Sequence, residues 1–80
     1  MKIQILGMGC AKCEKLAIEA QAAIALAGVE ATVEKITDAR EIAAFRVLST
    51  PALVIDGKVK ASGRVVPAAK IAAWLKEASA

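Results

Sequence analysis

The sequence contains no histidine and no tyrosine, and its only aromatic residues are Phe45 and Trp74. Without histidine the chain cannot build a histidine-based metal site or a cysteine–histidine nucleophile pair. With only two aromatic side chains, it also lacks a platform on which successive nucleic-acid bases would stack. These absences exclude three common classes of functional site.

Long apolar runs and blocks of like charge are also missing. No uninterrupted apolar run approaches the length of about 18 residues that marks a membrane-spanning helix. Gly7 interrupts the N-terminal segment before an apolar stretch of signal-peptide length accumulates. The net charge is only +3, and the basic residues are scattered from Lys2 to Lys76. We therefore expect a cytoplasmic protein that binds neither nucleic acid nor membrane.

The chain has 80 residues, so we expect a single domain over residues 1-80, acting as a monomer. Its two cysteines, Cys10 and Cys13, are close neighbours in the sequence. A disulfide between them would close a loop too small to stabilise the fold much. In a reducing cytoplasm such a pair is more often redox-active or metal-binding than structural.

Hydrophobic periodicity predicts the element order strand, helix, strand, helix, strand, strand, helix. Ile3 and Ile5 alternate with polar residues in a strand over residues 2–6. Good helix formers and an apolar stripe predict a helix over residues 11–27, and Gly28 is suited to end it in the left-handed conformation. The stripe consists of Leu16, Ala20, Ala23, Ile24 and Ala27.

The middle of the chain predicts an edge strand and a short helix. Val29, Ala31 and Val33 alternate with polar residues, which is typical of a strand with one wet face. Asp38 followed by Glu41 predicts a capping box for a short helix to about Phe45, whose apolar positions are Ile42 and Phe45.

The last third predicts a hairpin and a helix. Thr50-Pro51 precedes an apolar strand over 52–55, and Asp56-Gly57 is a strong hairpin signal before a return strand with Val59 and Ala61. Gly63 permits a bend, and Pro67 suits the first position of the last helix. The buried side of that helix is predicted to contain Ile71, Trp74, Leu75 and Ala78.

Cys10 and Cys13 are predicted to lie where the first strand gives way to the first helix. The unpaired N–H groups and positive dipole of a helix N-terminus favour a thiolate at Cys10. Lys12 and Lys15 add positive charge nearby. Cys13 lies one helical turn further on, where it can attack a mixed disulfide held on Cys10. We hypothesise that Cys10 is the attacking nucleophile and Cys13 the resolving thiol.

The segment from Gly7 to Cys13 also resembles the G-M-x-C-x-x-C loop of heavy-metal-associated domains and copper chaperones. Two thiolates suit Cu(I), whereas a structural zinc site needs four ligands and one chain supplies only two. Those domains have the order βαββαβ and end on a strand, while the last segment here has helical periodicity. The element order therefore favours redox chemistry. Soft-metal binding or transport is the alternative, and a binding module whose cysteines no longer cycle is a third hypothesis.

Three segments together carry a more specific resemblance. They are Gly9-Cys10-Ala11-Lys12-Cys13, Ser49-Thr50-Pro51-Ala52 and Val54-Ile55-Asp56-Gly57-Lys58. In combination they are similar to the short glutaredoxin-like thioredoxins, also called small redox-active disulfide proteins. The resemblance covers nearly the whole chain. It implies an α/β thioredoxin fold of order βαβαββα, with a four-stranded mixed sheet and three helices.

The resemblance also implies a function and a site. The function is thiol–disulfide exchange with protein disulfides, with a disulfide reductase as second partner. No organic cofactor and no metal are expected, because the cysteines carry the electrons. Thr50-Pro51 is implied to be a cis peptide beside the cysteines, and the backbone before the proline to pair with an extended segment of the partner. The partner-binding residues implied are Gly9, Ala11, Lys12, Thr50, Pro51 and Gly63.

The sequence departs from thioredoxin proper around the cysteines. The dipeptide between them is Ala-Lys rather than Gly-Pro, and no Trp precedes Cys10. Ile3 and Ile5 occupy the first strand, so no acidic residue is expected behind the site. General disulfide reductase activity therefore does not follow from the resemblance.

Overall fold

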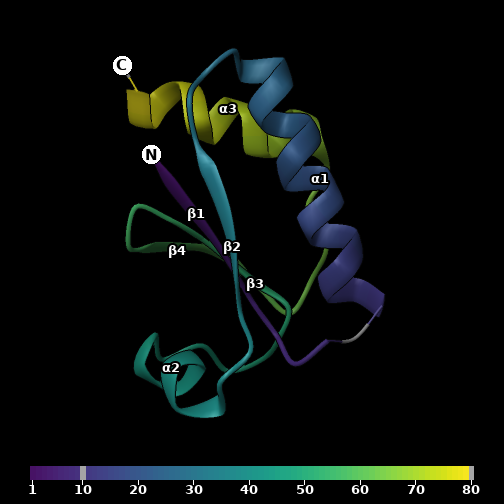
Figure 1. Ribbon diagram of the computed structural model, residues 1–80, viewed down its shortest axis with the longest axis vertical. Coiled ribbons are helices and arrows are strands. Elements are labelled where there is room, and N and C mark those ends of the chain that lie inside the picture. The colour runs from purple at the N-terminus through teal and green to yellow at the C-terminus, as the bar shows by residue number, and fades with distance from the viewer. Residues whose placement is uncertain (10, 80) are drawn as a thin grey trace.

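The computed structural model describes residues 1–9 and 11–79 and shows the predicted order of elements in them (Figure 1). The strands are β1 (Lys2–Leu6), β2 (Thr32–Ile36), β3 (Ala52–Ile55) and β4 (Lys58–Ser62). The helices are α1 (Ala11–Ala27), α2 (Ala39–Ala44) and α3 (Ala68–Ser79). Three helices and a four-stranded mixed sheet confirm the predicted fold class.

The four strands form one sheet in the order β2-β1-β3-β4. The strand pair β1–β2 is parallel, and the pairs β1–β3 and β3–β4 are antiparallel. In Figure 1, α1 and α3 lie on one side of the sheet and α2 lies on the other. Leu6 at the end of β1 pairs with Ala52 at the start of β3. The loop after β1 and the segment before β3 therefore meet at the same end of the sheet.

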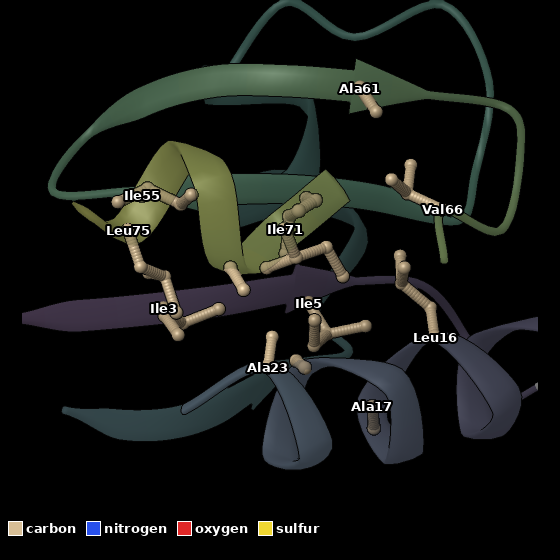
Figure 2. Close-up of a cluster of buried hydrophobic side chains, with 13 residues drawn as sticks. Ile3, Ile5, Leu16, Ala17, Ala23, Ile55, Ala61, Val66, Ile71 and Leu75 are labelled. Carbon is tan, nitrogen blue, oxygen red and sulfur yellow. The ribbon is translucent and has the colours of Figure 1, made fainter. Parts of the chain in front are cut away.

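The larger core lies between the sheet and the pair of helices α1 and α3 (Figure 2). Ile3 and Ile5 of β1 point into it, as their alternation predicted. Leu16, Ala20 and Ala23 of α1 are buried against the sheet, and Ile24 and Ala27 are partly buried there, which confirms the predicted stripe. Each large aliphatic side chain buried in this way stabilises the fold by about 1.5–3 kcal/mol.

A smaller core lies between the other face of the sheet and α2. Its buried members are Leu6, Ile36, Ile42, Ala52 and Val54, with Phe45 and Val47 partly buried beside them. Because successive residues of β3 point to opposite faces, this strand contributes to both cores and is buried along its whole length. Strand β3 therefore reads as an unbroken apolar run.

Local signals place two chain reversals and the start of one helix where they were predicted. Gly28, after α1, has a φ of 67°. The Asp38 carboxylate accepts hydrogen bonds from the backbone N–H groups of Arg40 and Glu41 and so caps α2. Asp56 and Gly57 have φ values of 46° and 84°, as a two-residue hairpin turn with both residues left-handed requires.

The start of β2 differs from the prediction. The edge position is confirmed, but the strand begins at Thr32 rather than at Val29. Its partner β1 begins at Lys2, which pairs with Thr32, so earlier residues have no strand to pair with. Val29 and Ala31 instead pack against the larger core as partly buried side chains.

Helix α3 begins at Ala68, one residue later than predicted, and Pro67 lies immediately before it. The Pro67 carbonyl accepts hydrogen bonds from the N–H groups of Lys70 and Ile71. Trp74 is half-buried against the larger core, and the prediction that Ala78 is buried is wrong. Ala72, next to Ile71, is buried instead, while Ala78 follows Trp74 along the side of the helix that borders an open recess near β4.

No helix in residues 1–9 and 11–79 combines the length and the apolar character needed to span a membrane.

Candidate active site

Cys13 and Gly7 are in direct contact at the start of α1. The helix begins at Ala11, so Cys13 lies in its first turn, and its side chain is only 5% exposed. A Cβ atom built on Gly7 would clash with the Cys13 Sγ atom and lie 3.2 Å from the Cys13 Cβ. The loop after β1 can pass this close to the sulfur because residue 7 has no side chain. Sequence reasoning took Gly7 only as the end of a strand and missed this contact.

Pro51 also lies beside Gly7. The Thr50–Pro51 peptide bond is cis, and Pro51 is buried while Thr50 is exposed. The Pro51 Cα atom lies 4.0 Å from the position that a Cβ atom on Gly7 would take, beside the Cys13 sulfur. Cys13 and Pro51 therefore both lie beside Gly7, although they are 38 positions apart in the sequence.

Gly63 joins this group through the backbone. Its N–H donates a hydrogen bond of 2.8 Å to the Pro51 carbonyl oxygen, and its φ is 76°. A Cβ on Gly63 would meet the Ser49 Oγ, so Ser49 and Gly63 also pack tightly. Gly63 was predicted as a site residue, whereas Ser49 was noted only as part of a motif. The loop from Ser49 to Pro51 is therefore held from the side of β4.

The other predicted site residues lie at the surface. Gly9, Ala11 and Lys12 are exposed at the start of α1. Cys10 lies outside the described residues, so its predicted place at the helix N-terminus stays a prediction. Cys13 belongs to the first helical turn, where the positive end of the helix dipole favours an anionic sulfur.

An ion pair adjoins Cys13 on the side of β2. The Lys35 Nζ atom lies 2.9 and 2.8 Å from the two carboxylate oxygens of Glu14. Both side chains line a small cavity of about 30 Å³ that Gly7 and Cys13 also line. The pairing of Ile5 with Lys35 across the sheet brings Lys35 here. This strand register was not in the sequence prediction, and sequence reasoning missed the pair.

Apolar side chains are exposed close to Thr50. Leu48 is 99% exposed and Met8 is 70% exposed. Together with Val47, Thr50 and residues of α2, they line a shallow surface pocket of about 280 Å³. Such exposure of large apolar side chains next to a candidate site is typical of a surface that contacts other molecules.

The sheet order and the position of the cysteine define a class of protein. A mixed sheet in the order β2-β1-β3-β4, with a buried cysteine in the first turn of the helix after β1, is the arrangement of thioredoxin-fold proteins. Residues 1–76 match the family model described as the thioredoxin domain. The chain therefore belongs to the thioredoxin family, and its function is of the thiol–disulfide oxidoreductase type.

Two curated relatives agree with this assignment. The chain is 42% identical over 65 residues to a thioredoxin of Methanothermobacter thermautotrophicus, with 81% of this chain and 84% of that protein covered. It is 32% identical over 74 residues to a thioredoxin of Methanocaldococcus jannaschii, with 92% of this chain and 85% of that protein covered.

Proposed function

We propose that the chain exchanges two electrons with protein disulfides through Cys10 and Cys13. The Cys10 thiolate attacks one sulfur of the partner's disulfide, and the other partner sulfur leaves as a thiolate that takes up a proton. The Cys13 thiolate then attacks the Cys10 sulfur of the mixed disulfide. The Cys10–Cys13 bond forms and the second partner sulfur leaves. A disulfide reductase restores the dithiol, and no organic cofactor or metal is required.

The observation that carries this proposal is the position of Cys13. Its sulfur is buried in the first turn of α1, against Gly7 and close to Pro51. A thiol shielded in this way reacts poorly with bulky external disulfides but remains available to a sulfur three residues earlier in the chain. This is what the resolving role demands.

The segment before Pro51 supports a protein partner. Thr50 is exposed, and the Pro51 carbonyl is already bonded to the Gly63 N–H. In our proposal the exposed Thr50 backbone forms hydrogen bonds with an extended segment of the partner, as in strand addition. Gly9, Ala11 and Lys12 border the same surface in this proposal.

Trapping the mixed disulfide tests the two cysteine roles. With Cys13→Ser, a disulfide-bonded substrate protein should remain covalently attached at Cys10, because the resolving thiol is missing. With Cys10→Ser, no such adduct should accumulate, because Cys13 is shielded. Adducts that form only with Cys10→Ser would reverse the roles. Adducts with neither variant would contradict the proposal.

A redox titration distinguishes this function from soft-metal transport. Helix α2 follows β2 in the order βαβαββα, whereas a strand follows the second strand in the βαββαβ order of heavy-metal-associated domains. We therefore expect reversible two-electron formation of one intramolecular disulfide in redox buffers. Stoichiometric Cu(I) binding that persists against glutathione, without reversible disulfide formation, would instead support the metal carrier.

A further inference from the structure

The charged residues in the first half of α1 lie on two different flanks of the helix. Glu14 lies on the flank that faces β2, where its carboxylate forms an ion pair. Glu19 lies on the flank that faces α3, because its Oε1 atom accepts a hydrogen bond from the Ala68 N–H. Lys12 and Lys15 precede Glu19 by seven and four residues, and residues at these spacings share one side of a helix. Both lysines therefore lie on the flank toward α3, away from Glu14.

The segment between β4 and α3 adds two more basic residues to this flank. Arg64 directly follows Gly63, and Lys70 lies in the first turn of α3; both border the same shallow hollow in the surface. Val66, from the same segment, packs with Leu16 of α1 in the larger core (Figure 2). Four basic residues therefore lie along the junction between α1 and the segment that leads into α3. We call them the basic patch: Lys12, Lys15, Arg64 and Lys70.

The positive charge of the basic patch is not neutralised within the described part of the chain. All four side chains are exposed. In residues 1–9 and 11–79 the single ion pair joins Glu14 to Lys35, so none of the four takes part in one. The Lys70 Nζ atom lies 5.9 Å from the centre of the Trp74 ring, a contact that adds no opposite charge. Because the net charge of the whole chain is only +3, the basic patch carries more positive charge than the entire protein.

The basic patch borders the candidate active site on one side only. Lys12 lies between the two cysteines in the sequence, and Arg64 follows Gly63, whose N–H is bonded to the Pro51 carbonyl oxygen. The exposed apolar surface around Leu48 includes residues of α2, which covers the other face of the sheet from α1 and α3 (Figure 1). The site therefore has a basic border toward α1 and α3 and an apolar border toward α2.

Resting on the proposed function, we infer that the preferred partners of this chain are proteins whose disulfide is flanked by acidic residues, and that these residues contact the basic patch. Opposite charges on two protein surfaces increase the rate of encounter and select the orientation in which they meet. The planar guanidinium of Arg64 can in addition bind a carboxylate through two hydrogen bonds. In this orientation the acidic residues of the partner lie toward α1 and α3, and its apolar residues lie toward α2.

Peptide disulfides of different charge test this inference. Three synthetic peptides carry the same intramolecular disulfide, flanked by Glu, Gln or Lys residues, and each is mixed with the reduced full chain. Oxidation of the chain is followed by acid quenching, alkylation of the remaining thiols and mass spectrometry. At about 0.02 M salt we expect the Glu peptide to react about tenfold or more faster than the Lys peptide, with the Gln peptide between them. At about 0.5 M salt the difference should shrink to about twofold or less, because salt screens exposed charges.

Paired substitutions distinguish the basic patch from the net charge of the chain. Lys15→Gln combined with Arg64→Gln removes two charges from the basic patch and should lower the ratio of the Glu-peptide rate to the Lys-peptide rate about threefold or more. Lys58→Gln combined with Lys76→Gln is the matched control. It removes two exposed charges at the start of β4 and in the last turn of α3, and should keep the ratio of the parent chain. Both pairs should react with the uncharged bis(2-hydroxyethyl) disulfide at the rate of the parent chain.

The outcomes distinguish this inference from the proposed function. Equal rates with the three peptides at low salt would show that flanking charge does not select partners, and the inference would be wrong. It would also be wrong if the control pair lowered the ratio as much as the pair in the basic patch. If neither the peptides nor bis(2-hydroxyethyl) disulfide oxidised the reduced chain, the proposed function itself would fail. Circular dichroism of each variant confirms that rate changes do not reflect unfolding.

Discussion

The sulfur of Cys13 lies so close to Gly7 that a Cβ atom on Gly7 would clash with it. Gly7 has no positive φ, so its small size rather than its backbone freedom is what the fold requires. Gly7→Ala should therefore force Cys13 or the loop to move and lower the free energy of unfolding by about 1–3 kcal/mol, as overpacking of a filled site does. It should also change the rate of mixed-disulfide resolution. Urea unfolding measures the first effect, and the rate at which the mixed disulfide of the chain with nitrothiobenzoate releases that thiol measures the second.

Gly28→Ala is the control for this substitution. Gly28 has a φ of 67° and open space around its Cα, so an alanine there costs about 1–2 kcal/mol through the backbone alone. It lies at the far end of α1 and should leave the thiol kinetics unchanged. Equal kinetic effects of the two variants would mean that the contact with Gly7 does not influence the reactivity of Cys13.

The contact between Gly63 and Ser49 predicts an energetic coupling. Gly63→Ala should destabilise the fold, both because φ is 76° and because the new methyl group would meet the Ser49 side chain. Ser49→Gly removes that obstacle, so the double variant should be more stable than the sum of the two single effects by about 1 kcal/mol. A double-mutant cycle in urea measures the coupling, and strict additivity would show that the two residues do not constrain each other.

Glu19 links the two helices that cover the larger core. Its Oε1 atom accepts a hydrogen bond of 2.8 Å from the backbone N–H of Ala68, the first residue of α3. Glu19→Ala should lower the free energy of unfolding by about 1–2 kcal/mol, the range for loss of a helix cap. Glu19→Gln should lower it less, because the amide oxygen still accepts the bond. Equal losses for both variants in urea unfolding would contradict the capping role.

Most of the fold could be predicted because its signals are local. Gly28 and the Asp56-Gly57 pair specify chain reversals through their own conformational preferences, and Asp38 specifies a helix start through its side chain. The structure places each as predicted. The errors arise where the limits of an element or the exposure of a residue depend on a neighbouring element. The start of β2 depends on where β1 begins, and the exposure of Ala78 depends on which side of α3 meets the sheet.

The site could be predicted only in part. The cysteine spacing and the Thr50-Pro51 motif are visible in the sequence. Gly63 was included among the partner-binding residues because of the resemblance. The contact of Gly7 with Cys13 and the position of Lys35 beside Glu14 depend on strand register and on close packing. Neither strand register nor close packing can be inferred from a single sequence. The place of Cys10 at the helix start stays a prediction.

The exposure of Leu48 leads us to expect that its substitution affects the reaction with protein disulfides but not the reaction with small disulfides. Its side chain is 99% exposed, so Leu48→Ser should change the free energy of unfolding by no more than about 0.5 kcal/mol. If a protein partner docks at Thr50, however, Leu48 loses its solvent contact, and burying a leucine is worth about 1.5–3 kcal/mol. We therefore expect the rate of reaction with insulin disulfides to fall about tenfold or more, while the rate with dithiobis(nitrobenzoate) stays the same. Leu26→Ser, at an exposed leucine near the far end of α1, is the matched control and should alter neither rate. An unchanged insulin rate with Leu48→Ser, or an equal loss with Leu26→Ser, would show that partners do not contact this apolar surface.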